Sequence, residues 1–202
     1  MKVSQSDPRS IRTCTLLREA MINLTAEKKF TNLTVQDITK QAGLNRTTFY
    51  LHYSGINELL DDCTRTLFNQ MRADIYGNEL FDFQSDITVL EPFVSSVFYH
   101  LEQYEDFYRT ILGKQGNPEF KSLFQALLSE LIFEPIVESK NQQEIDWQTE
   151  MGLRFTCSGF VGVIVWWLEK RKPVSVKQIS EQIVCDVLPD YLSLLSQKNV
   201  KE

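Results

Sequence analysis

Residues 34–60 constrain the fold of this 202-residue chain more than any other stretch, because they fit two short helices joined by a tight turn. Val35, Ile38 and Ala42 recur at helical spacing, which predicts an apolar face on the first helix. Gly43 follows at once and can adopt the positive φ that commonly ends a helix. The turn after this helix is therefore expected to be three or four residues long.

Capping residues mark both helices of this stretch. Thr34 is suited to cap the first helix, and Asp37 lies in its first turn, where an acidic side chain favours the helix dipole. Asn45 is suited to cap a second helix from Arg46 to about Tyr53, which Ser54 and Gly55 would end. A helix, a short turn containing glycine and a second helix form the helix-turn-helix pattern, whose second helix can enter a DNA major groove.

The side chains of this pattern suit contact with DNA. Phe49 and Tyr53 lie four residues apart and can anchor one face of the second helix to a core. The alternative is a small amphipathic helix whose polar face is merely solvated. The residues expected to form a DNA-binding surface, all able to hydrogen-bond a phosphate or a base edge, are Thr34, Gln36, Asn45, Arg46, Thr47, Thr48, Tyr50 and His52.

Residues 11 to about 60 resemble the N-terminal DNA-binding domain of the TetR/AcrR family of bacterial transcriptional regulators. The resemblance rests on Phe30, on the run LTVQDITKQAGLNRTTFYLHY that starts at Leu33, and on the Glu-Leu-Leu that follows. Two positions depart from the family pattern. Lys29 stands where the family often has glycine, and Ile56 stands where it usually has a lysine that meets a DNA phosphate. That contact is either absent or supplied by Asn57 or the N-terminal arm.

The resemblance implies an all-α protein of about nine helices in two parts. Residues 1–54 would form the DNA-binding domain, with an arm over residues 1–8, and residues 55–202 a helical ligand-binding and dimerisation domain. It also implies a homodimer on a pseudo-palindromic double-stranded DNA operator, acting as a repressor. In that arrangement Arg46 is the best candidate to recognise a guanine, while Thr34, Tyr50 and His52 hold phosphates.

Apolar residues at helical spacing continue through the rest of the chain. Pro135 is expected to kink or end one of these helices near Phe133. The run FTCSGFVGVIVWWL from Phe155 carries no charge, which is typical of a helix buried on all sides. Expected helices cover residues 9–27, 56–76, 89–103, 104–112, 118–133, 148–170 and a last segment carrying Ile179, Ile183, Val187, Tyr191 and Leu195, with Pro189 as a kink.

The last two helices fit the two-helix contribution of a TetR-type subunit to a dimer interface; the alternative is that they complete a monomeric core. The expected interface residues are Phe155, Gly159, Gly162, Val163, Trp166, Trp167, Ile179, Ile183 and Val187. Family members also hold a small effector, here a small apolar or aromatic molecule. The aromatic residues that would line its pocket, or alternatively form plain core, are Phe93, Phe98, Tyr99, Tyr104, Phe107, Tyr108, Phe124 and Phe155.

Charge and composition bound the function. The chain carries a net charge of −6, yet residues 1–70 hold 9 Lys/Arg against 7 Asp/Glu, so the DNA-binding part is weakly basic and the rest acidic. The four cysteines are far apart, as are the two histidines, which argues against a metal site. No cofactor and no enzymatic arrangement is indicated. The start is not a signal peptide and the longest apolar run is short for a bilayer, so a cytoplasmic protein without membrane contact is expected.

The same residues also allow a second function. It keeps the fold but makes the chain a protein-interaction or co-activator protein with weak or lost DNA binding. Ile56 and the weakly basic head are the features that favour it.

Overall fold

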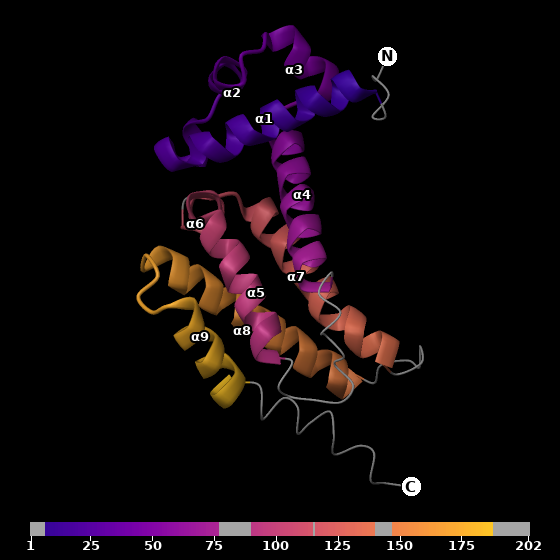
Figure 1. The fold of residues 1–202 in the computed structure, drawn as a ribbon, viewed down its shortest axis with the longest axis vertical. Coiled ribbons are helices and arrows are strands. Elements are labelled where there is room, and N and C mark those ends of the chain that lie inside the picture. Colours follow the sequence, from indigo (N-terminus) through magenta and orange to yellow (C-terminus); the bar gives the residue numbers. More distant parts are fainter. Residues whose placement is uncertain (1–6, 77–89, 115, 140–146, 188–202) are drawn as a thin grey trace, which may run out of the picture. The chain divides into compact units, whose positions relative to one another are not determined.

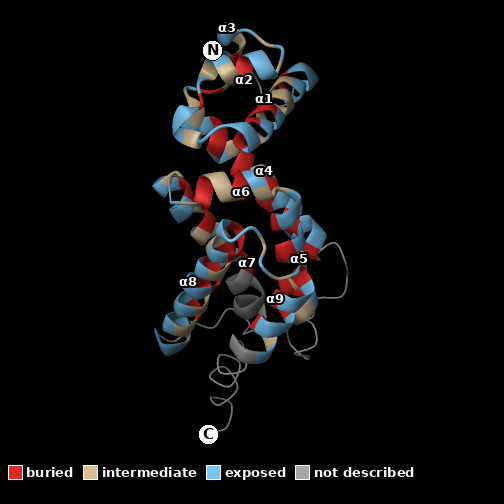
Figure 2. Cartoon of the chain, turned by 90° about the vertical axis from the view of Figure 1, so that its left-hand side faces the viewer, coloured by how far each residue is buried: buried red, intermediate tan, exposed pale blue. Residues whose placement is uncertain are grey.

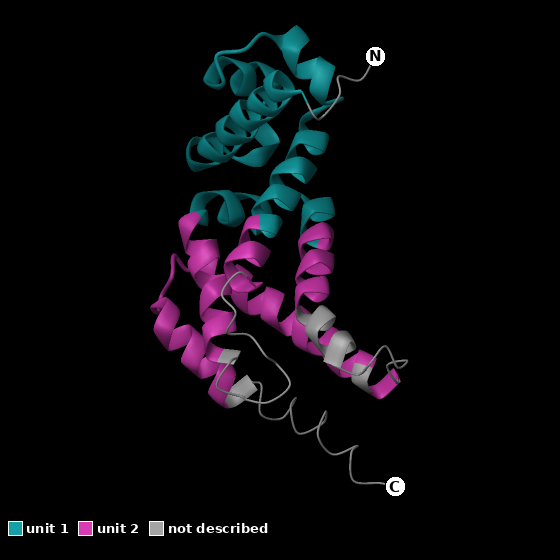
Figure 3. Cartoon of the chain, turned by 45° about the vertical axis from the view of Figure 1, so that its right-hand side comes forward, with its two compact units in different colours: residues 1–69, 104–121 teal, residues 70–103, 122–202 magenta. Residues whose placement is uncertain are grey.

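The computed structural model describes residues 7–76, 90–114, 116–139 and 147–187. Within these ranges the regular elements are nine α-helices with short 3₁₀ and π segments, and no strand (Figure 1). The all-α expectation is confirmed. The chain divides into two compact units, residues 1–69 with 104–121 (unit 1) and residues 70–103 with 122–202 (unit 2), coloured separately in Figure 3.

Unit 1 is built around three helices that pack on one another. They are α1 (Pro8–Glu27), α2 (Val35–Gln41) and α3 (Arg46–His52), with a 3₁₀ turn (Phe30–Asn32) between the first two. The side chain of Asp7 caps α1 by accepting a hydrogen bond from the backbone N–H of Arg9. Apolar side chains from these helices and from α4 (Ile56–Tyr76) form the core; fully buried members are Leu17, Met21, Ile38, Phe49, Leu59, Leu60 and Cys63.

The buried apolar side of α1 begins at Leu17 and does not include the first turn of the helix. Ile11 is 52% exposed, and its neighbour Ser10 is buried instead. The first turn of α1 directs Ser10 toward the end of α3, where its hydroxyl lies 3.5 Å from Nδ1 of His52. The phase of the helix in this turn is therefore set by a polar contact to α3.

Helix α6 (Glu105–Leu112) also belongs to unit 1, where it packs against α1. The hydroxyl of Thr110 donates a 2.9 Å hydrogen bond to the carbonyl of Thr25 near the end of α1. The ring of Phe107 meets that of Phe120 edge to face at 5.9 Å. Unit 1 thus contains more than a three-helix head, because a segment about 80 residues later in the chain completes it.

Unit 2 is formed by α5 (Leu90–Gln103), most of α7 (Pro118–Ser139), α8 (Trp147–Glu169) and α9 (Val176–Gln182). Its centre is aromatic: Phe98 meets Trp167 edge to face at 5.1 Å and Phe160 at 5.8 Å. The indole N–H of Trp167 donates to the carbonyl of Val174 at 2.9 Å, which joins α8 to the loop before α9. Helix α9 begins with a capping box, in which the side chains of Ser175 and Gln178 each accept a hydrogen bond from the backbone N–H of the other residue.

Most helix boundaries agree with expectation within one residue, and the end of α7 does not. Helix α7 continues to Ser139, so Pro135 does not end it near Phe133, and the alternative that Pro135 kinks the helix stays a prediction. A proline removes one backbone hydrogen bond, and the helix can resume on both sides of it. The last helix is α-helical as far as Gln182, where α9 gives way to a π turn over Ile183–Val187. Pro189, Tyr191 and Leu195 lie outside the described residues.

His100 on α5 makes the stability of the protein depend on pH. Its side chain is buried, and burial lowers the pKa of the imidazole to about 4 from 6.5, against the opposing effect of Asp74. In the unfolded chain His100 binds a proton at higher pH than in the folded chain. The contribution of His100 to stability is therefore fully present above pH 6.5 and is lost as the pH falls toward 4. We expect His100 to remove about 2 kcal/mol of unfolding free energy between pH 7 and pH 5.

Chemical denaturation of the wild type and of His100→Gln at both pH values measures this. The substitution changes the absolute stability, so the quantity compared is the loss between the two pH values, which should be about 2 kcal/mol smaller in the variant. Equal losses in the two proteins would show that His100 is not the group responsible.

Candidate nucleic-acid interface

The entrance to α2 is fixed by a reciprocal cap. The hydroxyl of Thr34 accepts a hydrogen bond from the backbone N–H of Asp37 at 3.1 Å, and the Asp37 carboxylate accepts one from the N–H of Thr34, also at 3.1 Å. Lys28 donates to the same carboxylate at 2.6 Å, and this contact, with the hydrogen bonds from Thr34, lowers the pKa of Asp37 to about 2. The N-cap predicted from the sequence is confirmed, and its acid is held charged at neutral pH.

The turn between α2 and α3 is tight. Gly43 takes a φ of +67°, the left-handed conformation that favours glycine, and the N–H of Leu44 reaches the carbonyl of Thr39 at 2.8 Å. Asn45 then caps α3, since its side-chain oxygen accepts hydrogen bonds from the N–H of Thr48 at 2.7 Å and from the Thr48 hydroxyl at 2.9 Å. Both helix ends in this stretch follow the sequence prediction.

Helix α3 has an anchored side and a free side. Phe49 is fully buried and Tyr53, its C-cap, is 6% exposed, and their rings lie 5.8 Å apart. The residues on the other side are exposed to solvent. This exposed arc consists of Arg46, Thr47, Tyr50 and Leu51. A helix held by its aromatic side and open on its polar side is suited to lie in a groove.

Leu51 was missed by the sequence prediction. It is an exposed apolar residue, four positions after Thr47, so helical spacing alone places it on the arc. An apolar side chain at this place can contact the methyl group of a thymine.

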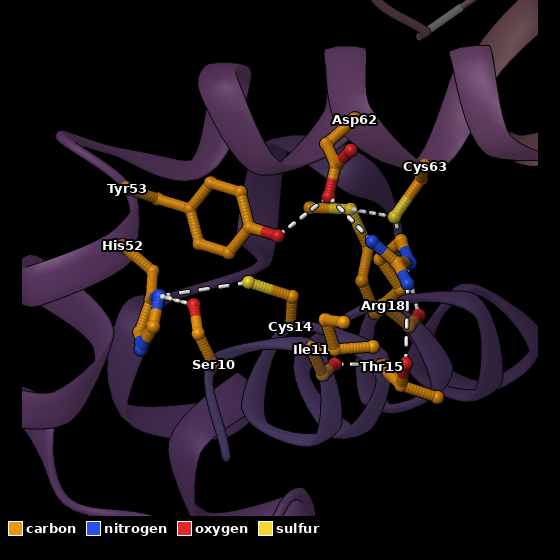
Figure 4. A network of polar contacts seen from close by, with 10 residues as sticks. Ser10, Ile11, Cys14, Thr15, Arg18, His52, Tyr53, Asp62 and Cys63 are labelled. Carbon is orange, nitrogen blue, oxygen red and sulfur yellow. Dashed lines mark hydrogen bonds and ion pairs between the residues drawn. The ribbon is translucent and has the colours of Figure 1, made fainter. Parts of the chain in front are cut away.

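The eight residues predicted for the DNA surface divide by what their side chains already contact. Thr34, Gln36, Asn45, Arg46, Thr47 and Tyr50 are exposed, whereas Thr48 and His52 are half-buried. Thr48 donates to Asn45, as described above. His52 directs Nδ1 inward, at 3.5 Å from both the Ser10 hydroxyl and the Cys14 thiol of α1, which leaves Nε2 for any outside partner (Figure 4).

The position where Ile56 replaces the usual lysine opens α4. Ile56 is half-buried, and just before the helix the backbone N–H of Ser54 donates a 2.7 Å hydrogen bond to the carboxylate of Glu58. The first turn of α4 therefore carries an acidic side chain, Glu58, and has isoleucine at the position where the family usually has lysine.

The aromatic residues expected to line an effector pocket are divided between the two units. Tyr104, Phe107 and Tyr108 belong to unit 1, while Phe93, Phe98, Tyr99, Phe124 and Phe155 belong to unit 2. Two of the latter are exposed, Tyr99 by 57% and Phe155 by 82%. Phe93, Phe98 and Phe124 are buried within unit 2.

Helix α8 has one buried side and one exposed apolar side, visible as red and pale blue along the helix in Figure 2. The exposed side is a stripe at helical spacing, which we call the α8 stripe: Met151, Phe155, Gly159, Gly162 and Trp166. A Cβ atom added at either glycine would meet nothing within 4 Å. Burial of α8 on all sides would therefore need a second copy or another partner against this exposed side.

Three residues predicted for the dimer interface lie in the core of unit 2. Trp167 is fully buried, and Ile179 and Ile183 are each 5% exposed. Trp167 follows Trp166 directly, and a helical step of one residue places the two indoles on different faces. Val163 is half-buried, and the side chain of Val187 lies outside the described part of the chain.

The described residues can also be examined for a metal site and for a helix that could cross a membrane. Among the described residues, no group of three or more His, Cys, Asp and Glu side chains is placed to hold a metal ion. Glu150–Glu169 of α8 is long and apolar enough to cross a membrane by length and composition alone, although this stretch includes Glu150, Arg154 and Glu169. Leu153, Cys157 and Ile164 of this stretch are nonetheless packed inside unit 2.

Comparison with known families places both parts of the chain among bacterial regulators. Residues 17–63 match the model of bacterial regulatory proteins of the tetR family, and residues 89–184 match that of a transcriptional regulator C-terminal region.

Curated relatives match over part of their length. The chain is 40% identical over 75 residues to the uncharacterized HTH-type transcriptional regulator YxbF of Bacillus subtilis (strain 168), covering 37% of this chain and 19% of that protein. It is 30% identical over 92 residues to the uncharacterized regulator YvdT of the same strain, covering 44% and 45%. The matches thus span less than half the length of these relatives.

Solved structures share the fold over nearly the whole chain. A TetR transcriptional regulator from Streptococcus agalactiae 2603V superposes with a TM-score of 0.63 at 24% identity, covering 86% of this chain and 92% of that one. A tetR-family regulator from Streptomyces coelicolor gives 0.67 at 13% identity, covering 94% and 85%. The dihydroxyacetone kinase operon activator DhaS gives 0.62 at 19% identity, covering 96% and 99%.

Proposed function

Because the chain belongs to the TetR family of transcriptional regulators, we propose that it acts as a homodimer that binds a pseudo-palindromic operator and represses transcription there. The observation that carries this proposal is the exposed arc of α3 on a helix whose opposite side is anchored by Phe49 and Tyr53. The same reading makes the protein a cytoplasmic regulator without enzymatic activity or membrane contact.

In the proposed complex the exposed arc enters the major groove. Arg46 carries paired guanidinium donors that match the two acceptors of guanine, and Leu51 contacts a thymine methyl. Thr34, Gln36, Asn45 and Tyr50 hold phosphates and fix the register without reading sequence, as phosphate contacts do. His52 adds a phosphate contact through Nε2, since Nδ1 is turned toward α1.

The α8 stripe supports dimerisation. Exposed apolar residues in a continuous row mark an interaction surface, and glycines in the row permit close approach of a second helix. A second copy related by a two-fold axis would set stripe against stripe and cover Phe155 and Trp166 in both protomers. Two recognition helices would then be presented to successive major grooves about 34 Å apart.

Release by a small effector is the remaining part of the proposal. Its support is the buried aromatic set Phe93, Phe98 and Phe124 of unit 2, which offers apolar surface of the kind that binds small apolar or aromatic molecules. An effector would act only through different affinities for the DNA-competent and DNA-incompetent states of the dimer.

Ile56 favours a second candidate function, a protein-interaction or co-activator role with weak autonomous DNA binding. If a missing phosphate contact is the cause of weak binding, Ile56→Lys should restore it. We expect about a tenfold gain in affinity for any duplex, with the salt dependence steeper by about one unit. Fluorescence anisotropy titrations between 50 and 200 mM salt measure both. An unchanged salt slope would show that this position does not reach DNA.

The experiment that tests the proposed function is selection of bound fragments from random duplex DNA by the purified full-length protein at near-physiological salt. Enrichment of a pseudo-palindromic sequence supports a dimeric, sequence-specific regulator. Enrichment of a single half-site supports DNA reading but contradicts the symmetric dimer. No enriched sequence contradicts autonomous recognition and favours the interaction role.

A further inference from the structure

A carboxylate behind the recognition helix joins three helices of unit 1. Oδ2 of Asp62, on α4, accepts a 2.5 Å hydrogen bond from the phenol of Tyr53 and a 2.9 Å hydrogen bond from the guanidinium of Arg18 on α1 (Figure 4). The second arm of this guanidinium donates to Thr15 at 3.2 Å. One oxygen atom is thus the meeting point of the end of α3, the middle of α1 and the second turn of α4.

Tyr53 is the link from this network to the surface that contacts DNA. It is the C-cap of α3, and its backbone N–H bonds to the carbonyl of Phe49, one helical turn back. The ring is buried beside that of Phe49, so only the phenolic oxygen reaches a polar partner. Holding the phenolic oxygen of Tyr53 in place therefore holds the C-terminal end of α3 in place. This helix is only seven residues long, and its opposite side is the exposed arc.

The phenol of Tyr53, which donates the hydrogen bond to Asp62, keeps its proton over the physiological pH range. Burial raises the pKa of the Tyr53 phenol well above its usual value, and the hydrogen bond to Asp62 raises it further. The phenol therefore stays protonated and continues to donate. Two donors on one carboxylate oxygen also restrict the Asp62 side chain to a single orientation.

The exposure of the network argues that it serves geometry more than stability. The side chains of Asp62 and Arg18 are 37% and 20% exposed, and ion pairs in such partly solvated settings contribute little to folding. A binding surface, by contrast, depends on supporting hydrogen bonds that hold its side chains close to the productive geometry.

We propose that Asp62 is a positioning residue for DNA recognition, which sets the angle of α3 through Tyr53 while Arg18 holds Asp62 in place. This inference rests on the proposed function, because it concerns the same DNA surface. In this proposal Asp62 does not contact DNA, yet it affects how strongly the protein prefers its operator to an unrelated sequence. The network reads no base itself.

The test compares affinities for the selected operator and for an unrelated duplex of equal length, by anisotropy at fixed salt. Tyr53→Phe removes one hydroxyl and keeps the ring, so the core remains filled. We expect its operator affinity to fall about fivefold to tenfold, while affinity for unrelated duplex changes by less than about twofold. Asp62→Ala should lose as much of the preference, and Asp62→Asn, which keeps an acceptor oxygen, should recover part of it.

Two controls separate positioning from other effects. Asp61→Ala removes the same negative charge from an exposed neighbour and measures the general gain in DNA affinity that follows. The double variant Tyr53→Phe/Asp62→Ala should lose no more preference than Asp62→Ala alone, because both substitutions break one link. Circular dichroism checks that each protein is folded at the temperature of the titration.

The outcomes distinguish this proposal from the proposed function. If the wild type selects a site and Tyr53→Phe retains the wild-type ratio of operator to unrelated affinity, the positioning role is wrong. A fall of equal size for both duplexes would also overturn it, since that reports loss of folded protein. If the wild type selects no site, the proposed function itself has failed.

Discussion

Replacing Phe155 with glutamate is expected to convert the dimer into a monomer and to weaken binding to a palindromic operator by about 100-fold or more. Phe155 is 82% exposed and belongs to the α8 stripe, so in a symmetric dimer it would be buried against the partner. A glutamate there would place two unpaired carboxylates in an apolar interface, which costs several kcal/mol. Each monomer would then meet its half-site alone and lose the gain from linked binding.

Sedimentation velocity gives the oligomeric state, and operator titration gives the affinity. Tyr99→Glu is the matched control: it also replaces an exposed aromatic residue of unit 2 with an acid, but on α5 and outside the stripe. We expect that variant to stay dimeric. If Phe155→Glu also stays dimeric with unchanged operator affinity, the α8 stripe is not the interface.

Arg46→Ala is expected to relax sequence choice at one base position of each half-site, at a cost of about 1–3 kcal/mol there. Arg46 is exposed at the first position of α3, where no hydrogen bond within the described residues holds its guanidinium. A bidentate contact to guanine would be lost with the side chain, so the preferred base pair would bind no better than the other three.

The measurement is a set of operators, each with one base pair changed, titrated with wild type and variant. Lys40→Ala provides the comparison, because Lys40 is an exposed cation of α2 and a point charge of this kind contacts phosphates. It should weaken all operators alike and reduce the salt dependence. If Arg46→Ala behaves in the same way as Lys40→Ala, Arg46 holds a phosphate and reads no base.

Local features of the chain were predictable because their causes are local. Thr34 with Asp37, Gly43 and Asn45 fix both helix ends of the candidate site through contacts within a few residues. The bounds of α4 follow for the same reason, and the structure has them where the sequence predicts, at Ile56 and Tyr76.

The features that were missed depend on contacts between distant parts of the chain. Arg18 and Asp62 are 44 residues apart, and no local pattern links them. The place of α6 in unit 1 rests on contacts such as that of Thr110 with Thr25, 85 residues away. The orientation of α8 was also hidden, because a helix with apolar residues on all sides has no polar stripe to show which of Trp166 and Trp167 is inside.

The ratio of affinities for the selected operator and for a shuffled duplex of the same composition, at one near-physiological salt concentration, tests the central claim most directly. A chain whose α3 reads bases should prefer its operator by about a thousandfold or more. A ratio near one, with a salt dependence that accounts for all of the binding, would contradict sequence-specific recognition by this helix.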